Sequence, residues 1–301
     1  MIIGDVCAAL EQWAPPALAY DWDRAGLSIG STRTPLTGVL VALSVTPETL
    51  KAAQKAGANL IVSHHPVLWE PLKHLRTDDP VTRFYLDVAQ AGIACYSAHT
   101  NLDVAPGGVN DILADRLGLT ETRPLFPATH VKQFKLVTFV PESHVPILRD
   151  AVCAAGAGRI GNYTHCTFSG KGYGTFLPND DANPYLGERN RVSEEPERRF
   201  EVLVSEACLK DVIPALKAAH PYEEVAYDLV CLHDADNAVG LGVQGTLPKA
   251  QSLDTFAKTL CKTLDVSHIR VVGTSRRKIR TVAVLGGAGG SDVPNIPDDV
   301  D

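Results

Sequence analysis

Apolar residues in the first third of the chain follow two alternating patterns, one with helical spacing and one continuous. A Thr-Pro-Glu start at 46–48 predicts a helix to residue 56, because Pro at the first helical position and an early acidic residue favour helix initiation. Similar helical spacing occurs at 3–11, 80–92 and 107–117. Short apolar runs predict buried strands at 38–45, 59–64 and 93–98. This alternation is typical of a parallel sheet covered by helices.

The pattern changes after Leu119, where the Pro-containing stretch 122–127 predicts a linker. The segment 126–237 then follows the order strand, helix, strands, helix, strand, which is typical of a ferredoxin-like fold. Inside it, glycines at 170, 172 and 174 predict a flexible turn between two short strands. Residues 238–301 predict strands at 240–245, 269–272 and 281–285 and a helix at 253–264.

We therefore predict an α/β fold, a mixed sheet with helices on both faces, interrupted by an α+β insert. The main domain is expected at 1–125 and again at 238–301, and the ferredoxin-like insert at 126–237. The return of the strand and helix pattern after the insert indicates that the chain re-enters its first domain.

Composition excludes several classes of protein. The chain has 301 residues, 45% of them hydrophobic and 21% charged, which suits a large core and excludes a disordered or collagen-like chain. No run approaches the roughly 20 apolar residues of a membrane span, and the first residues lack the features of a signal peptide. Seven cysteines without a C-x-x-C pair predict reduced, buried side chains. We expect a cytoplasmic protein that does not bind membranes.

The charge distribution argues against nucleic-acid binding. The formal net charge is −7, and the basic residues are scattered apart from Arg276, Arg277, Lys278 and Arg280. Binding to phosphates needs a concentrated basic face, so this small cluster is interpreted as a solvated loop and nucleic acid is not an expected partner.

Two adjacent histidines, His64 and His65, stand at the end of the second predicted strand. Open parallel sheets bind ligands outside the carboxyl ends of their strands, so the position suits a functional site. Neighbouring residues on an extended backbone point to opposite sides, and Pro66 biases His65 toward extended geometry. The pair could therefore serve two different metal ions, or one histidine could bind a metal while the other packs.

A second polar segment, His99-Thr-Asn-Leu-Asp103, follows the third predicted strand. If these two strands are neighbours, as consecutive strands usually are, the segment meets His64 and His65 at one edge of the sheet. Asp103 would then supply an oxygen ligand beside the imidazoles, although it could instead cap the following helix. His99 could hold Asp103 or a ligating imidazole by a hydrogen bond.

Several segments resemble the family of GTP cyclohydrolase 1 type 2 homologues, also called NIF-three-like proteins. The resemblance rests on WDRAGLSIG at 22–30, VSHHPVLWEPLK at 62–73 and SAHTNLDVAPGGVNDILAD at 97–115. Residues 135–176 and AHPYEEVAYDLV at 219–230 are similar to the insert of the longer bacterial members, which is related in fold to the PII-type and copper-tolerance-type trimeric proteins.

This resemblance implies a site for two divalent metal ions per subunit, with His64, His65 and Asp103 as ligands and each histidine on a different ion. Zinc, iron, manganese and cobalt all suit such ligands. It also implies a homohexamer with trimer contacts through the insert, and metal-assisted hydrolysis of a nucleotide-like substrate, with His99 as a candidate proton carrier.

Two features depart from the family's usual pattern. Ser44 stands where the family usually has an Asp, and no His follows His268 and no Glu follows Glu224, whereas the family's later segment carries a second His and a Glu. We therefore expect a truncated copy that binds metal weakly and exposes a hydrophobic sheet edge. The alternatives to a hydrolase are a non-catalytic regulatory or scaffold protein and an inactive truncated copy.

Overall fold

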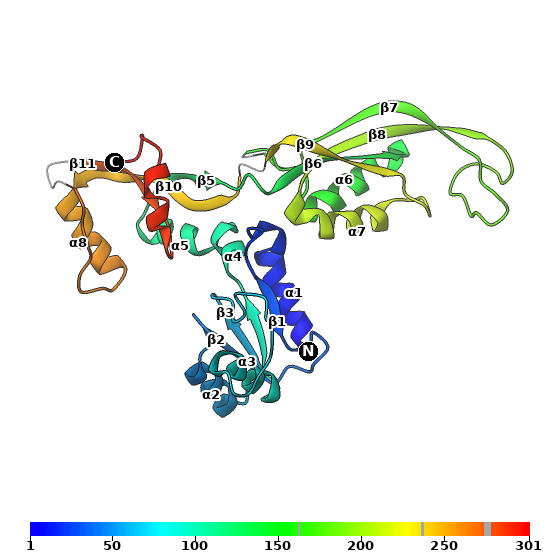
Figure 1. The fold of residues 1–301 in the computed structure, drawn as a ribbon. Helices are drawn as coiled ribbons and strands as arrows, with labels where there is room; N and C mark the ends of the chain where they lie inside the picture. Colours follow the sequence, from blue (N-terminus) through cyan, green and yellow to red (C-terminus); the bar gives the residue numbers. More distant parts are fainter. Residues whose placement is uncertain (162, 236–237, 274–277) are drawn as a thin grey trace. The chain divides into compact units, whose positions relative to one another are not determined.

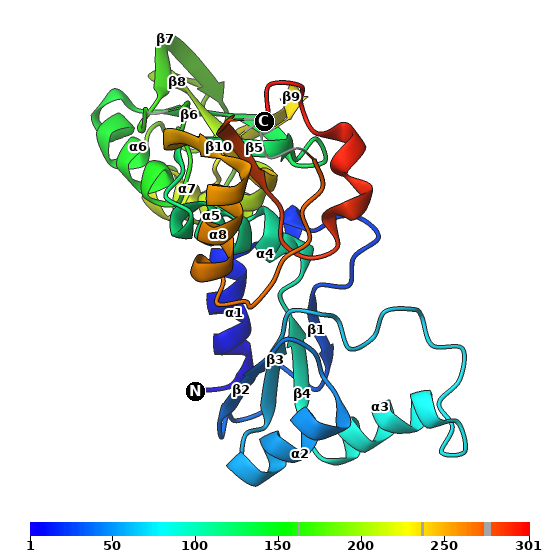
Figure 2. The ribbon, with the colours of Figure 1, turned by 90° about the vertical axis from the view of Figure 1, so that its left-hand side faces the viewer.

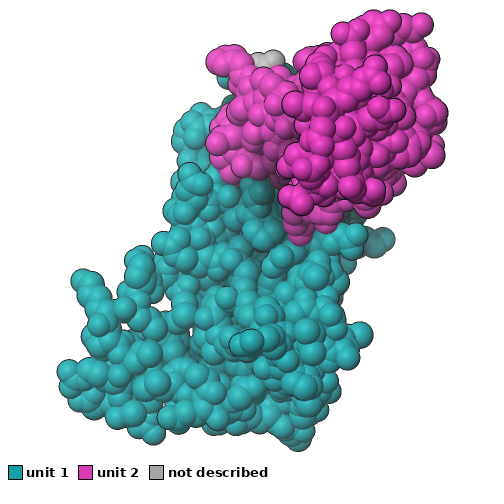
Figure 3. Space-filling view, turned by 90° about the vertical axis from the view of Figure 1, so that its right-hand side faces the viewer, with its two compact units in different colours: residues 1–128, 237–301 teal, residues 129–236 magenta. Residues whose placement is uncertain are grey.

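The computed structural model describes residues 1–161, 163–235, 238–273 and 278–301, so Arg276 and Arg277 of the basic cluster lie outside the described residues. The chain divides into two compact units, coloured separately in Figure 3. The first unit comprises residues 1–128 and 237–301, and the second comprises 129–236. The first unit thus contains both ends of the chain.

The amino-terminal part of the first unit is built on a four-stranded mixed sheet (Figure 1). Its strands are β1 (Gly26–Ile29), β2 (Val39–Ala42), β3 (Leu60–Ser63) and β4 (Ala94–Ser97). The order is β1-β4-β3-β2, in which β4, β3 and β2 run parallel and β1 pairs antiparallel with β4. The neighbouring parallel positions of β3 and β4 confirm the arrangement expected from the sequence.

Helices cover both faces of this sheet, because alternate residues of each strand point to opposite sides. On one face, Ile61 packs with buried residues of α2 (Pro47–Ala56) and α3 (Pro80–Gln90). On the other face, Leu60 packs with α1 (Ile3–Trp13). Figure 2 shows α2 and α3 below the strands that they cover.

The helix α2 begins and ends as its sequence indicates. The Thr46 side chain accepts a hydrogen bond from the Thr49 amide at 3.3 Å, and Pro47 occupies the first helical position. Gly57 ends the helix at a φ of 70°, a left-handed conformation that favours glycine.

The strand β2 forms one edge of the sheet. Its outward side chain Val41 is 78% exposed, and Leu43, just beyond the strand, is 66% exposed. An edge strand of this kind presents unpaired backbone groups together with apolar side chains.

A second, three-stranded antiparallel sheet completes the first unit, in the order β11-β10-β5. Its strands are β5 (Thr120–Pro127), β10 (Gly240–Ser252) and β11 (Lys278–Val284). The helices of this part are α4 (Thr100–Val104), α5 (Val109–Arg116) and α8 (Leu253–Thr263). None of the helices in the described residues is both long and apolar enough to span a bilayer.

Two expectations for this part were wrong. The predicted linker at 122–127 is part of β5, an edge strand, where Pro124 and Pro127 are tolerated because only one side of the strand needs to pair. The predicted strand at 269–272 is absent from the described residues. Val272 is 90% exposed there, so the apolar run is not buried against a sheet.

The second unit contains a four-stranded antiparallel sheet and two helices. In chain order the elements are β6 (Lys132–Val140), α6 (Val145–Ala154), β7 (Thr167–Phe176), β8 (Ser193–Ser205), α7 (Leu209–Ala219) and β9 (Tyr227–Ala235). The sheet order is β7-β8-β6-β9, and the core lies between the sheet and the two helices, where Phe200 packs with Leu148 and Leu216. Short 3-10 turns complete the two units: η1 (Pro16–Leu18), η2 (Glu142–His144), η3 (Glu206–Cys208), η4 (Gly289–Ser291) and η5 (Val293–Asn295).

The glycines at 170, 172 and 174 lie inside β7, so the flexible turn expected there was wrong. The strand pairs with β8 without interruption, from Thr167 opposite Val202 to Phe176 opposite Ser193. At Gly174 an added Cβ would lie 2.1 Å from the Glu197 carboxylate, so any side chain there would require the flexible end of Glu197 to move. This glycine therefore leaves room beside β7 for the Glu197 carboxylate.

Candidate metal centre

The ends of β3 and β4 bring the two polar segments together. Ser63 and Ser97 are paired across the strands, and His64 and His99 follow them within two residues. The Ser63 hydroxyl donates to the backbone oxygen of His65 at 2.8 Å, which ties the chain immediately after β3 back to the strand. Parallel neighbours thus place both segments at one edge of the sheet, where such sheets bind ligands.

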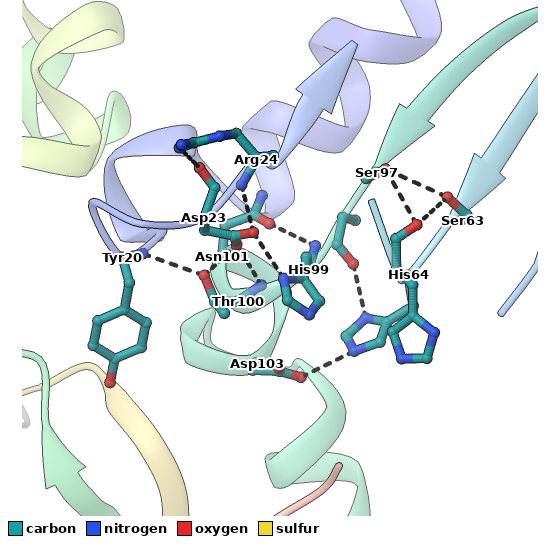
Figure 4. Close-up of polar contacts among 12 residues, drawn as sticks. Tyr20, Asp23, Arg24, Ser63, His64, Ser97, His99, Thr100, Asn101 and Asp103 are labelled. Atoms are coloured by element: carbon teal, nitrogen blue, oxygen red, sulfur yellow. Dashed lines mark hydrogen bonds and ion pairs between the residues drawn. The ribbon is translucent and has the colours of Figure 1, made fainter. Parts of the chain in front are cut away.

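Three imidazole rings gather at this edge, and Figure 4 shows His64 and His99 on neighbouring segments. The ring centroids of His64 and His65 are 5.3 Å apart, those of His64 and His99 are 5.1 Å apart, and those of His65 and His99 are 6.1 Å apart. The structure therefore brings His64, His65 and His99 together, as the strand arrangement predicted.

His64 faces Asp103 with the nitrogen that a metal ion would need. Its Nδ1 lies 2.9 Å from the Ala98 carbonyl oxygen, which can only accept a hydrogen bond, so Nδ1 carries the proton. The Nε2 atom is then the lone-pair nitrogen, and it lies 3.8 Å from Oδ1 of Asp103 (Figure 4). This separation is too long for a hydrogen bond but within the roughly 4.2 Å that two metal–ligand bonds of about 2.1 Å can span.

His65 is held by the residue that departs from the family pattern. Its Nδ1 lies 2.8 Å from the Ser44 hydroxyl, and its backbone amide donates to Leu43 O at 2.9 Å. Burial and the neighbouring His64 lower the pKa of His65, which favours the neutral imidazole that metal ions bind. A serine thus supports this ring through a neutral hydrogen bond instead of a carboxylate.

Asp103 lies within the short helix α4, and its side chain is largely buried. The next helix, α5, has Gly108 at its N-cap, so Asp103 does not cap it. Burial raises the pKa of Asp103, and the charges of nearby imidazoles act in the opposite direction. Among the described residues no hydrogen-bond donor reaches this carboxylate, whose nearest polar partner is His64. A positive charge at this position would stabilise the ionised form.

Asp23 is a site residue that the sequence reasoning missed, although it lies inside the WDRAGLSIG segment. Its side chain is fully buried, and its Oδ1 accepts from Nδ1 of His99 at 2.8 Å. The Thr100 amide donates to its other oxygen at 3.0 Å, and the Thr100 hydroxyl donates to the same atom (Figure 4). Burial raises the pKa of Asp23, but these hydrogen bonds outweigh burial and hold the pKa at about 2. A buried aspartate between a Trp and an Arg was the only available signal.

The donors suit a divalent ion, but they do not form a complete cage for one ion. Within the residues that the structure describes, no group of three or more His, Cys, Asp or Glu side chains is placed to hold a single metal ion. Imidazole nitrogens and a carboxylate are ligands that zinc, iron, manganese and cobalt accept. The residue types fit a divalent ion, and the Nδ1 atom of each imidazole has a hydrogen-bond partner that would leave Nε2 for the ion.

Two exposed tryptophans stand beside the histidines. The rings of Trp22 and Trp69 lie 6.3 Å and 5.6 Å from that of His99, and 5.9 Å from each other. Their side chains remain 56% and 49% exposed. Both belong to the segments that resemble the family, so the site has a partly open aromatic border.

Comparisons with known proteins identify the family of this chain. The family model Duf34/NIF3 (NGG1p interacting factor 3) matches residues 1–301. The chain belongs to the Duf34/NIF3 family. The GTP cyclohydrolase 1 type 2 homolog of Halalkalibacterium halodurans is 43% identical over 284 residues, which cover 94% of this chain and 76% of that protein. The Bacillus subtilis protein of the same name is 42% identical over 279 residues, covering 93% and 75%.

A solved structure is similar as well. The crystal structure of the Bacillus cereus protein related to NIF3 superposes with a TM-score of 0.80 at 42% identity, covering 96% of this chain and 77% of that chain. The mixed α/β architecture of this NIF3-family chain is therefore shared with a relative of known structure. The chain spans about three quarters of the length of these relatives.

Proposed function

We propose that this NIF3-family chain is a divalent-metal-dependent hydrolase acting on a nucleotide-like substrate. The observation that carries the proposal is the convergence of His64, His65 and Asp103 at the carboxyl ends of β3 and β4. All three side chains can bind metal, and both imidazoles have a hydrogen-bond partner at Nδ1. Packing at the end of a strand does not require such an arrangement.

In this proposal His64 and His65 serve different ions and Asp103 helps to complete the pair, giving two ions per subunit. The attachment of the two rings to different partners, Ala98 and Ser44, supports this division. A bound divalent ion would supply an electrophilic centre and lower the pKa of a coordinated water. Zinc, iron, manganese and cobalt remain equivalent by ligand type.

His99 has the position of a proton carrier. Its Nδ1 donates to Asp23 at 2.8 Å, which fixes the orientation of the ring. Its Nε2 is then the atom that accepts or gives a proton beside His64, whose ring lies 5.1 Å away. Asp23 would act through His99, as a positioning residue.

The tryptophan rings beside the site favour a substrate that contains a planar heterocycle. Exposed indole rings bind bases by stacking, which contributes about 1–3 kcal/mol per base. Trp22 and Trp69 offer such faces next to His99. The name of the relatives, GTP cyclohydrolase 1 type 2 homolog, points to the same substrate class.

The proposal includes the cell compartment and the assembly. The absence of disulfide-type cysteine spacing supports a cytoplasmic protein. The exposed edge of β2 supports self-association, for which a homohexamer with trimer contacts through residues 129–236 is the proposed form. Nucleic acid and membranes are not proposed partners.

The deciding experiment combines metal content with turnover. Elemental analysis of the purified protein should give divalent ions that are lost in His64→Ala/His65→Ala and retained in His74→Ala, an exposed histidine of the same unit. Metal-dependent hydrolysis should then appear in a nucleotide panel and disappear in Asp103→Ala. Light scattering on each variant keeps a loss of metal separate from a loss of assembly.

Two outcomes would overturn the hydrolase. Unchanged metal content in the double histidine variant would reject the site itself. Metal bound at this site without turnover of any nucleotide in the panel would favour the non-catalytic alternative, a regulatory or scaffold protein.

A further inference from the structure

A separate pocket lies within the second unit, between β7, β8 and the segment after α7. Its volume is about 570 Å³, within the range of small-molecule sites, and its lining is mainly apolar and aromatic. The aromatic side chains that line it are Phe139, Tyr173, Phe176, Tyr185 and Tyr222. All of its residues lie between 139 and 226, so the pocket belongs to this unit alone.

One carboxylate is buried in this aromatic wall. Glu197, in the middle of β8, is only 9% exposed and lines the pocket. Its Oε1 accepts a hydrogen bond from the Tyr222 hydroxyl at 2.8 Å. Its other oxygen lies against Gly174, where the missing side chain leaves the room that the carboxylate occupies. The sequence thus provides a place for a buried negative charge.

No cation of the described chain pairs with Glu197. The two arginines that follow it on β8 bind other carboxylates, Arg198 with Glu142 and Arg199 with Glu201. His220 is neutral, because its Nδ1 accepts from the Tyr222 amide while its Nε2 donates to the Phe139 carbonyl oxygen. Burying a carboxylate without a cationic partner costs free energy of folding, so its presence here favours a functional role.

The surroundings of Glu197 are those that recognise organic cations. The rings of Tyr185 and Tyr222 are 6.2 Å apart, and those of Phe176 and Tyr222 are 6.5 Å apart, so several aromatic faces border one space. Glu223 and Glu224 also line the pocket, and Glu223 is fixed by the Asn183 amide at 2.8 Å. Aromatic faces and carboxylates both attract a cation, and the faces add contact with an apolar body.

We propose that this pocket binds a small organic ammonium ion with an apolar or aromatic body, its charge on Glu197 and its body against the tyrosine and phenylalanine rings. The site is independent of the metal centre in the first unit. It gives residues 129–236 a binding role of their own.

The test is titration calorimetry of the full chain with tryptamine and with tryptophol, which replaces the ammonium group by a hydroxyl. Tryptamine should bind saturably, and tryptophol at least tenfold more weakly. Glu197→Gln keeps the size of the side chain and an acceptor for Tyr222. It should lower the affinity for tryptamine at least tenfold. Glu194→Gln removes the same charge from an exposed position on β8 and should change nothing.

A second measurement separates binding from folding. Without ligand, Glu197→Gln should keep or raise the melting temperature, because it removes an unpaired buried charge, whereas tryptamine should raise the melting temperature of the wild type and not of Glu197→Gln. Equal binding of the two probes, no binding of tryptamine up to its solubility, or full binding by Glu197→Gln would overturn the proposal. Light scattering that shows Glu197→Gln dissociating an oligomer would also overturn it, because a neighbouring chain would then occupy the pocket.

Discussion

Two sides of the 99–103 segment differ in how their polar groups are satisfied. Toward the amino-terminal helix, Thr100 and His99 donate to the buried Asp23, and Asn101 donates to the Ala14 carbonyl oxygen at 2.7 Å. Toward β3, the Asp103 carboxylate has His64 at 3.8 Å as its one polar side-chain partner among the residues that the structure describes. The 99–103 segment thus makes several hydrogen bonds on one side. On the other side its Asp103 carboxylate accepts no hydrogen bond from the described residues.

These two sides suggest a division of roles, with one side supporting the fold and the other available to the proposed metal ion. Buried groups that are fully hydrogen-bonded rigidify the structure around them, whereas a carboxylate without donors is free to bind an ion. The supporting side should therefore control stability, and the open side should control metal affinity. Three substitutions and one change of pH test this division, and they are given in decreasing order of effect.

The largest effect is expected from Asp23→Asn. The amide keeps the shape but loses the charge that four donors share, from His99, from the amide and hydroxyl of Thr100 and from the Arg24 amide, so the free energy of unfolding of the first unit should fall by about 3–5 kcal/mol. Urea denaturation followed by tryptophan fluorescence measures this, because Trp13, Trp22 and Trp69 all lie in that unit. A variant within about 0.5 kcal/mol of wild type, the range of a neutral surface substitution, would contradict the supporting role.

Next in size is the loss of metal affinity in Asp103→Asn. Removing a metal ligand should lower metal affinity more than removing a residue that only hydrogen-bonds to a ligand. We therefore expect Asp103→Asn to lose roughly 100-fold or more in affinity for Zn²⁺ or Mn²⁺. The unfolding free energy should rise or stay constant, because a buried carboxylate with a raised pKa is removed. Asp115→Asn, at an exposed position of α5, is the control in the calorimetric titration. If Asp103→Asn and Asp115→Asn bound the metal ion with equal affinity, Asp103 would not be a metal ligand.

Acid should weaken the supporting side in a defined range. The pKa of Asp23 is about 2 in the folded chain, below its usual value near 3.8, so its stabilisation is present above about pH 4 and is lost as the pH falls toward 2. The shift corresponds to about 2 kcal/mol. The gap in unfolding free energy between wild type and Asp23→Asn should therefore narrow across this range in urea titrations. A gap that stays constant down to pH 2 would show that the charge of Asp23 contributes nothing.

The smallest effect is expected from Ser44→Ala. The Ser44 hydroxyl lies 2.8 Å from His65 Nδ1, and its loss leaves the ring less firmly oriented. A residue that hydrogen-bonds to a metal ligand typically contributes about 10-fold to metal affinity. Ser31→Ala, at an exposed position, is the matched control. An unchanged affinity would mean that His65 is not a ligand or is held by other contacts.

The parts that could be predicted from the sequence are those with local or periodic signals. The parallel neighbours β3 and β4, and the convergence of His64, His65 and Asp103, follow from strand ends and from the family resemblance. Asp23 could not be found in this way, because its partners lie 76 and 77 residues away. β5 was taken for a linker because its prolines suggest a break, whereas the structure tolerates them at a sheet edge.

The open edge of β2 would link the proposed metal binding to local unfolding. Leu43 O and the Ser44 hydroxyl follow this strand directly, and both hold His65. When β2 frays, both supports are lost, so an ion bound by His65 favours the closed strand by mass action. Amide hydrogen exchange in residues 39–42 should therefore slow when metal is added, although no atom of β2 would touch the ion.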